Sequence, residues 1–150
     1  MTIPTMRVTL GLRGDYAVRA MLALASLEGE DRRASVRWIA ERMSIPVRFL
    51  PHVMADLNHA GLVVGAPGRR GGYRLARAAA EIDVLQVVDA VDPDDGVRRC
   101  VLRGGPCNPD GRCAVHDLFA GASAAMRDAL SSQSLRDLAI SGGLRSTLDG

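Results

Sequence analysis

Apolar residues recur at helical spacing in three segments of the first part of the chain. One segment spans residues 15–27, a second covers residues 36–43, and a third ends near Ala60. Ser35 is a residue type that caps the start of a helix, and the Ser-Ile-Pro segment at 44–46 interrupts the periodicity. The pattern predicts three consecutive helices, with a tight turn between the second and the third.

The hydrophobic period changes after the third helix. Residues 62–64 and 73–75 are short segments typical of strands, and the segment between them, 65–72, is rich in glycine. This arrangement predicts a two-stranded hairpin with a basic tip at Arg69 and Arg70. A helix, a short helix, a helix and a basic hairpin, in that order, indicate a winged helix-turn-helix.

Further elements are expected in the second half of the chain. Asp83 is placed to cap a helix over residues 84–91. Residues 98–113 contain several glycines and prolines and predict a loop. A long helix is expected from about residue 114, and a short one over residues 135–140.

The long helix carries a stripe of small and larger apolar residues. They are Leu118, Phe119, Ala122, Ala125, Met126, Ala129 and Leu130. Small side chains let a second helix approach closely, so the stripe indicates a dimerisation helix. The alternative is that this helix folds back on the core of its own subunit.

The expected fold class is therefore mainly α with a small β-wing: a winged helix-turn-helix plus a long dimerisation helix. Residues 1–91 would form the DNA-binding domain and residues 92–113 a cysteine-containing loop that binds a cluster. Residues 114–150 would form the dimerisation helix and the C-terminal tail.

The distribution of charge favours duplex DNA as a partner. The formal net charge is only +2, but the segment from Gly65 to Arg77 contains four arginines and no acidic residue. One Trp, two Tyr and two Phe are too few for the stacking platforms that bind single strands or RNA.

Four side chains are candidates for DNA contact. In a helix-turn-helix the second helix enters the major groove, and residues near its start reach the base edges. Arg48 and His52 occupy such positions, and Arg48 is the first candidate because arginine matches guanine O6 and N7. Arg69 and Arg70 would contact phosphates or the minor groove. Pro51 falls inside the third helix and predicts either a bend or a shifted start.

The three cysteines, Cys100, Cys107 and Cys113, all lie in the predicted loop, and His116 follows them in a C-x6-C-x5-C-x2-H pattern. Thiolates are suitable ligands for iron–sulfur clusters, zinc and copper(I). An iron–sulfur cluster is preferred because the C-x2-C pairs common in structural zinc sites are absent. Zinc remains an alternative, as do unliganded thiols.

The chain has no apolar run of about 18 to 20 residues, the length that a membrane span requires, and its start lacks a secretion-signal pattern. We therefore expect a cytoplasmic protein with no membrane partner. Clustered cysteines in odd number, in a reducing compartment, favour a metal over a disulfide.

Three short segments occur together with the cysteines: RGDYAVRAM at 13–21, AGLV at 60–63 and GGYRLAR at 71–77. In this combination the chain, from about Val8 to Ala139, resembles the Rrf2 family of bacterial transcription regulators. The resemblance implies a winged helix-turn-helix homodimer, crossed by a long helix, that binds partly palindromic operators. It also implies a [2Fe–2S] or [4Fe–4S] cluster that senses redox state, nitric oxide, or the supply of iron or clusters.

The resemblance also extends to individual ligands. The three cysteines match the cluster ligands of the family, whose fourth ligand varies among members. His116 resembles the histidine that completes a [2Fe–2S] site in some of them, and Asp15 falls where nitric-oxide sensors use an aspartate of the partner subunit. The wing departs from the family pattern Arg-Gly-Pro-Gly-Gly-Gly, because residues 67–72 read PGRRGG, and this departure puts the base contact of the family's wing arginine in question.

Two other functions use the same cysteines. One is a zinc- or thiol-based regulator of the same fold, and the other is an iron–sulfur electron-transfer protein. An enzyme is not expected, because the sequence shows no second cofactor motif, no nucleophile with its base and no paired carboxylates.

Overall fold

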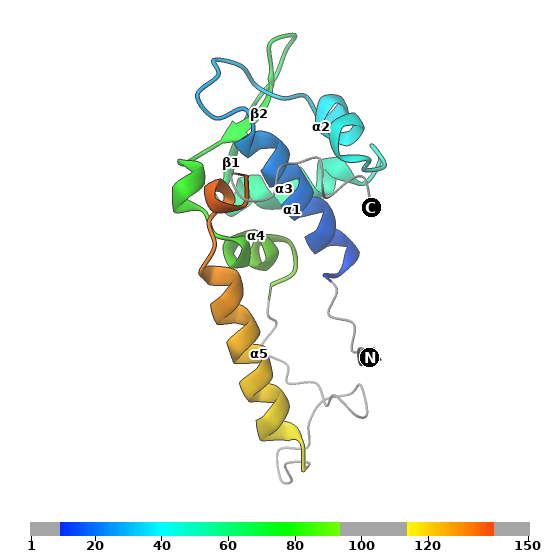
Figure 1. The fold of residues 1–150 in the computed structure, drawn as a ribbon. Coiled ribbons are helices and arrows are strands. Elements are labelled where there is room, and N and C mark those ends of the chain that lie inside the picture. The colour runs from blue at the N-terminus through cyan, green and yellow to red at the C-terminus, as the bar shows by residue number, and fades with distance from the viewer. Residues whose placement is uncertain (1–9, 94–113, 140–150) are drawn as a thin grey trace, which may run out of the picture.

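The computed structural model describes residues 10–93 and 114–139. Figure 1 shows a helical body with a hairpin at one end and a long helix that projects from the other. The elements in chain order are α1 (Leu12–Ala25), α2 (Val36–Met43), α3 (Leu50–His59), β1 (Val63–Ala66), β2 (Gly72–Leu75), a 3-10 turn (Ala79–Glu81), α4 (Val84–Val91) and α5 (His116–Ser131). This order confirms the predicted fold class, mainly helical with a two-stranded wing.

Helix α1 runs through the body and packs against α2, α3 and α4. Its alanines at 17, 20 and 23 are fully buried, and their small side chains allow the neighbouring helices to approach closely. The space between the helices is filled by larger apolar side chains: Met21, Ile39, Met43, Leu50, Met54, Leu57, Ile82 and Val87.

The first helix begins earlier and ends earlier than the predicted range of 15–27. Its first turn closes where the Asp15 N–H donates to the Gly11 carbonyl, at 2.9 Å. Arg13 and Gly14 lie in this turn and give no apolar signal, so the hydrophobic period could not place the start.

Helix α2 has a defined start and a defined end. At the start of α2, the Ser35 hydroxyl accepts a hydrogen bond from the Trp38 N–H at 3.0 Å, as the predicted cap requires. At its end, Ser44 has a φ of 54°, in the left-handed region that reverses the chain after a helix.

Helix α3 begins at Leu50, after a turn over residues 47–49. Pro51 therefore lies in the first turn of the helix, where a backbone N–H has no intrahelical partner to lose. Of the two effects predicted for Pro51, the shifted start occurs.

The wing is a hairpin in which Val63 pairs with Leu75 and Ala66 with Gly72. The first strand extends further toward the tip than the predicted 62–64, so the connection shortens to residues 67–71.

The chain returns to the body after α5. Ser134 forms a bridge with Asp83, the residue whose side chain caps α4 by accepting from the Gln86 N–H at 2.9 Å. The Leu135 N–H donates to the Ile82 carbonyl at 2.9 Å, and the Leu135 side chain is fully buried in the core. Residues 135–139 are helical, which agrees with the predicted short last helix in the described part of the chain.

Helix α5 projects from the body beyond α4 (Figure 1). None of its residues is buried, and Leu118 and Met126 are 69% and 44% exposed. Arg127 attaches it to α4 through two hydrogen bonds to the Asp89 carboxylate, at 3.1 and 2.9 Å. No helix in the described ranges is long and apolar enough to cross a bilayer.

Candidate nucleic-acid interface

Arg48 and His52 lie on the solvent side of the helix-turn-helix. His52 is in the first turn of α3, whereas Arg48 is in the turn that precedes the helix, slightly outside the predicted location. Both are exposed, while Leu50, Val53 and Leu57 of the same helix are buried. The apolar stripe holds α3 on the body and leaves these two side chains available to a ligand.

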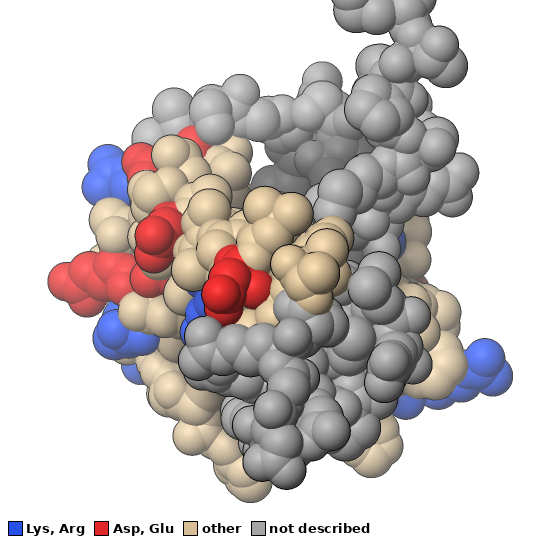
Figure 2. Space-filling model, turned by 90° about the horizontal axis from the view of Figure 1, so that it is seen from below, with Lys and Arg blue, Asp and Glu red and all other residues tan. Residues whose placement is uncertain are grey.

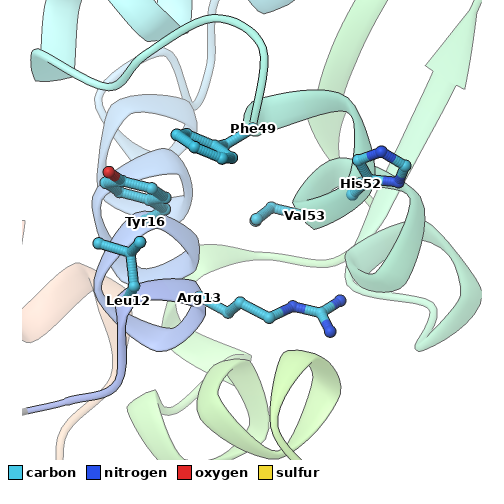
Figure 3. Close-up of a pocket in the computed structure, with 6 residues that line it drawn as sticks. All are labelled: Leu12, Arg13, Tyr16, Phe49, His52 and Val53. Atoms are coloured by element: carbon cyan, nitrogen blue, oxygen red, sulfur yellow. The ribbon is translucent and has the colours of Figure 1, made fainter.

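A pocket of about 300 Å³ opens between the start of α1 and the start of α3 (Figure 3). Its lining is mainly apolar and comes from both helices: Leu12, Arg13, Tyr16, Phe49, His52 and Val53. In Figure 3 the Tyr16 and Phe49 rings face each other, and the Arg13 side chain extends from α1 toward α3.

Arg13 is a functional candidate that the sequence did not indicate. Its guanidinium forms an ion pair with Asp56, the only acidic residue of α3. A carboxylate on a helix that entered a DNA groove would repel phosphates, and this pairing offsets the charge of Asp56. The arginine precedes the first apolar residue of the helical pattern, and its partner is distant in the sequence, so no local signal connects the two.

The wing presents Arg69 and Arg70 at the two central positions of a tight turn. The Gly71 N–H donates to the Gly68 carbonyl at 3.0 Å and closes this turn, and both arginines are exposed. Glycine is required at position 71, because a Cβ there would lie 2.2 Å from the Ala66 carbonyl oxygen. The turn therefore places two cations at the end of the hairpin.

The wing and the helix-turn-helix form one connected unit. Ala34 and Tyr73 exchange two backbone hydrogen bonds, at 2.8 and 2.7 Å, and the next residue, Ser35, caps α2. Arg33 adds a hydrogen bond from its guanidinium to the Val64 carbonyl at 3.3 Å. The hairpin is thus held at a fixed position relative to α2 and α3.

The opposite end of the molecule has a different charge character. Figure 2 views the face that points away from the hairpin, and there acidic side chains lie both near the middle and at one edge of the described surface, with basic ones among them and at other edges. Phosphates are attracted to clustered cations, so the cationic turn at the hairpin end is a candidate DNA-binding surface.

The predicted metal ligands are only partly within the described residues. Cys100, Cys107 and Cys113 lie outside them. His116 begins α5 and Asp15 lies in the first turn of α1, so these two candidates belong to different parts of the fold. In residues 10–93 and 114–139 no three His, Cys, Asp or Glu side chains gather as they would around a metal ion.

The Asp15 carboxylate is already engaged within its own helix. The Arg19 guanidinium donates to both of its oxygens, at 2.9 and 2.6 Å. The same guanidinium donates to the Met43 carbonyl at the end of α2, at 3.2 Å. Asp15 and Arg19 together therefore fasten α1 to the helix-turn-helix.

Comparison with solved structures supports this fold assignment. The chain superposes on a structure described as T. potens IscR with a TM-score of 0.72 and 25% identity, covering 96% of this chain and 91% of the other. It also matches the oxidized form of Staphylococcus aureus CymR, with a TM-score of 0.70 and 25% identity over 88% of this chain and 96% of the other.

Sequence comparison identifies the family. The chain is 38% identical over 126 residues to the HTH-type transcriptional regulator IscR of Photorhabdus laumondii, covering 84% of this chain and 76% of the relative. The family model Rrf2, described as an iron-dependent transcriptional regulator, matches residues 10–140. The chain therefore belongs to the Rrf2 family of DNA-binding transcriptional regulators, and it is not an enzyme.

Proposed function

We propose that this regulator binds a partly palindromic operator as a homodimer, and that its affinity for the operator depends on an iron–sulfur cluster held by Cys100, Cys107 and Cys113. One observation carries the DNA-binding part of the proposal. The exposed side chains of α3 and the cationic turn of the wing belong to one unit, fixed by the Ala34–Tyr73 bridge.

Each candidate DNA contact has its own role in this proposal. Arg48 reads a base edge in the major groove, and His52 makes a second contact from the first turn of α3. Arg69 and Arg70 contact phosphates or enter the minor groove, because they project from a turn that contains no acidic residue. Arg13 keeps Asp56 paired beside the same surface.

The proposed dimer uses α5. This helix has no buried residue in the described subunit, and its alanines at 122, 125 and 129 form a narrow stripe. A second copy of α5 packed on this stripe would cover Leu118 and Met126. A two-fold dimer presents two α3 helices and two wings, which requires a two-fold related DNA site.

The donor set fits a cluster. Three thiolates within one short segment are soft ligands that suit a [2Fe–2S] or [4Fe–4S] cluster, and an imidazole or a carboxylate can be the fourth ligand. When bound, the cluster would supply a centre that oxidants, nitric oxide or iron limitation alter. Two observations support this part of the proposal: the iron-dependent description of the family and the similarity to IscR.

We favour His116 over Asp15 as the fourth ligand. Both oxygens of Asp15 accept hydrogen bonds from Arg19, so ligation by Asp15 of the partner subunit would compete with that ion pair. His116 follows Cys113 closely in the sequence and needs no partner chain.

The position of the cysteines suggests how the cluster affects DNA binding. They lie between α4, which packs on α1 and α3, and α5, which is attached to α4 by the Arg127–Asp89 pair. A change in this segment can alter how α5 sits on α4 and hence the spacing of the two α3 helices in a dimer. Coupling of about 1 to 3 kcal/mol between two such sites is typical.

Anaerobic purification tests the cluster directly. We expect a coloured protein with iron and sulfide in stoichiometric amounts, and loss of the visible absorption in each of Cys100→Ala, Cys107→Ala and Cys113→Ala. Far-ultraviolet circular dichroism should show that all three variants remain folded. His116→Ala should change the visible spectrum and Asp15→Ala should not. Colour retained in two of the cysteine variants would exclude a shared site.

A second candidate function is a thiol- or zinc-based regulator. The observation that favours it is the similarity to CymR, one of whose structures is described as an oxidized form. A colourless anaerobic protein that contains zinc, or one without metal whose thiols oxidise reversibly, would support this function instead.

A further inference from the structure

A column of four side chains joins α1 to the start of α3. The Arg19 guanidinium carbon lies 5.9 Å from the centre of the Tyr16 ring. The Tyr16 and Phe49 rings are stacked, with centroids 6.1 Å apart and planes inclined by 24° (Figure 3). The Arg48 guanidinium carbon lies 4.7 Å from the centre of the Phe49 ring. The contacts therefore follow one another in the order cation, ring, ring, cation.

The two ends of the column differ in their surroundings. At the inner end, Arg19 is held by two hydrogen bonds to Asp15 and one to the Met43 carbonyl, and Tyr16 is only 9% exposed. At the outer end Arg48 is exposed, and its contact in the described part of the chain is the Phe49 ring. The column thus connects a fixed anchor to the candidate base-reading side chain.

Phe49 is one of several large apolar residues that are partly exposed to solvent. It is 38% exposed and lies in the turn before α3, so burial in the core does not account for its whole ring. Its ring contacts both the Tyr16 ring and the Arg48 guanidinium.

The physical consequence concerns the orientation of Arg48. A free arginine side chain samples many rotamers, and ordering it for a bidentate contact with a base costs conformational entropy. Stacking on an aromatic ring restricts the plane of the guanidinium before DNA arrives. A cation–π contact at an exposed site is worth about a two- to five-fold change in an equilibrium constant.

We propose that Phe49, supported by Tyr16, is a positioning residue that presents the Arg48 guanidinium to a base edge and thereby sets how sharply the protein discriminates at that base pair. This inference rests on the proposed base-reading role of Arg48. In this inference Phe49 contributes to sequence specificity and not only to the packing of the core.

The test uses full-length protein and an operator selected from a pool of randomised duplexes. Fluorescence anisotropy gives the affinity for this operator and for its single-base variants. Phe49→Leu keeps an apolar side chain but removes the ring, and Phe49→Tyr keeps the ring. We expect Phe49→Leu to reduce discrimination at the Arg48 base pair by about two- to five-fold, whereas Phe49→Tyr preserves it. Val47→Ala, a matched change at an exposed apolar neighbour, should leave discrimination there unchanged.

Two results would overturn the inference. One is unchanged discrimination in Phe49→Leu while Arg48→Ala relaxes it, and the other is a loss of affinity for all duplexes alike with the base preference preserved. If Arg48→Ala itself leaves the base preference unchanged, the proposed reading role of Arg48 fails first. Circular dichroism checks the fold, and Phe49→Met replaces Phe49→Leu if the leucine variant does not fold.

Discussion

Tyr73 of the wing and Ala34 of the segment before α2 exchange two backbone hydrogen bonds, with N to O distances of 2.8 and 2.7 Å. Backbone pairing of this kind fixes register as well as distance. Because Ser35 follows Ala34 and caps α2, the position of the wing depends on the position of the helix-turn-helix. The proposed DNA contacts of the two elements are therefore geometrically coupled.

The first prediction concerns Gly72, which lies next to this bridge. Gly72 has a φ of 120°, and a Cβ there would lie 2.4 Å from the Ala34 carbonyl oxygen. Gly72→Ala should lower the free energy of unfolding by about 2 to 4 kcal/mol, from backbone strain together with overpacking. Gly68→Ala is the control: its φ is 98° but nothing lies within 4 Å, so strain alone should cost about 1 to 2 kcal/mol. Urea denaturation measures both, and equal losses would show that the bridge does not constrain position 72.

The second prediction concerns the cations of the wing. Arg69→Ala and Arg70→Ala should each weaken binding to specific and random duplexes to a similar degree, and each should reduce the slope of log affinity against log salt by about 1. Arg77→Ala is a matched control, because its guanidinium donates to the Gln86 side chain at 3.1 Å, away from the turn. A salt slope that is unchanged in both wing variants would mean that the turn does not contact phosphates.

The third prediction tests the attachment of α5 to α4. Arg127 and Asp89 are paired through two hydrogen bonds, but their side chains are 42% and 37% exposed, so solvent screens the pair. A double-mutant cycle with Arg127→Ala and Asp89→Ala should give a coupling energy of about 0.2 to 1 kcal/mol. A single Arg127→Ala substitution would also remove a further interaction of Arg127, so the double-mutant cycle is needed to isolate the pair with Asp89. A coupling energy of zero would show that the pair does not stabilise the attachment of α5 to α4.

The fourth prediction concerns pH and the short helix that follows α5. The backbone N–H of Ser134 hydrogen-bonds the Asp137 carboxylate at 3.1 Å, and this contact, followed by the Ser134 side chain, lowers the pKa of Asp137 below its ordinary value. A lowered pKa stabilises the fold above the pKa of the unfolded chain, and this contribution disappears as the pH falls through the folded-state pKa. Asp137→Asn keeps an acceptor oxygen without the charge.

Thermal melts of both proteins between neutral pH and about pH 3 check this prediction. Wild type should be the more stable protein at neutral pH, and the difference should shrink as the solution becomes acidic. A difference that is constant with pH would show that the carboxylate charge does not contribute.

The sequence predicted those elements whose signals are local. Ser35 and Asp83 cap the helices they were expected to cap, and the apolar period over residues 36–43 and 84–91 matches the observed helices. These features depend on hydrogen bonds and faces formed by residues that are close in sequence, so the pattern contains the necessary information.

Contacts between distant segments were not predictable in the same way. The pairing of Ala34 with Tyr73, the return of Leu135 to the core and the ion pair between Arg13 and Asp56 join residues far apart in the chain. The candidate site shows both cases. The exposed position of Arg48 could be predicted from the apolar stripe of the third helix. Its stacking on Phe49 depends on the turn before α3, which the sequence pattern assigned to the helix.

The most direct test of the central claim compares operator binding by cluster-loaded and cluster-free protein. Both forms are titrated under anaerobic conditions at the same salt concentration, because affinity for DNA depends steeply on salt. We predict affinities that differ by about 5- to 150-fold, and that the Cys107→Ala variant, taken through the same cluster loading, binds with the affinity of the cluster-free wild type. Equal affinities for the two forms would contradict cluster-dependent regulation and leave a DNA-binding regulator whose cysteines serve another purpose.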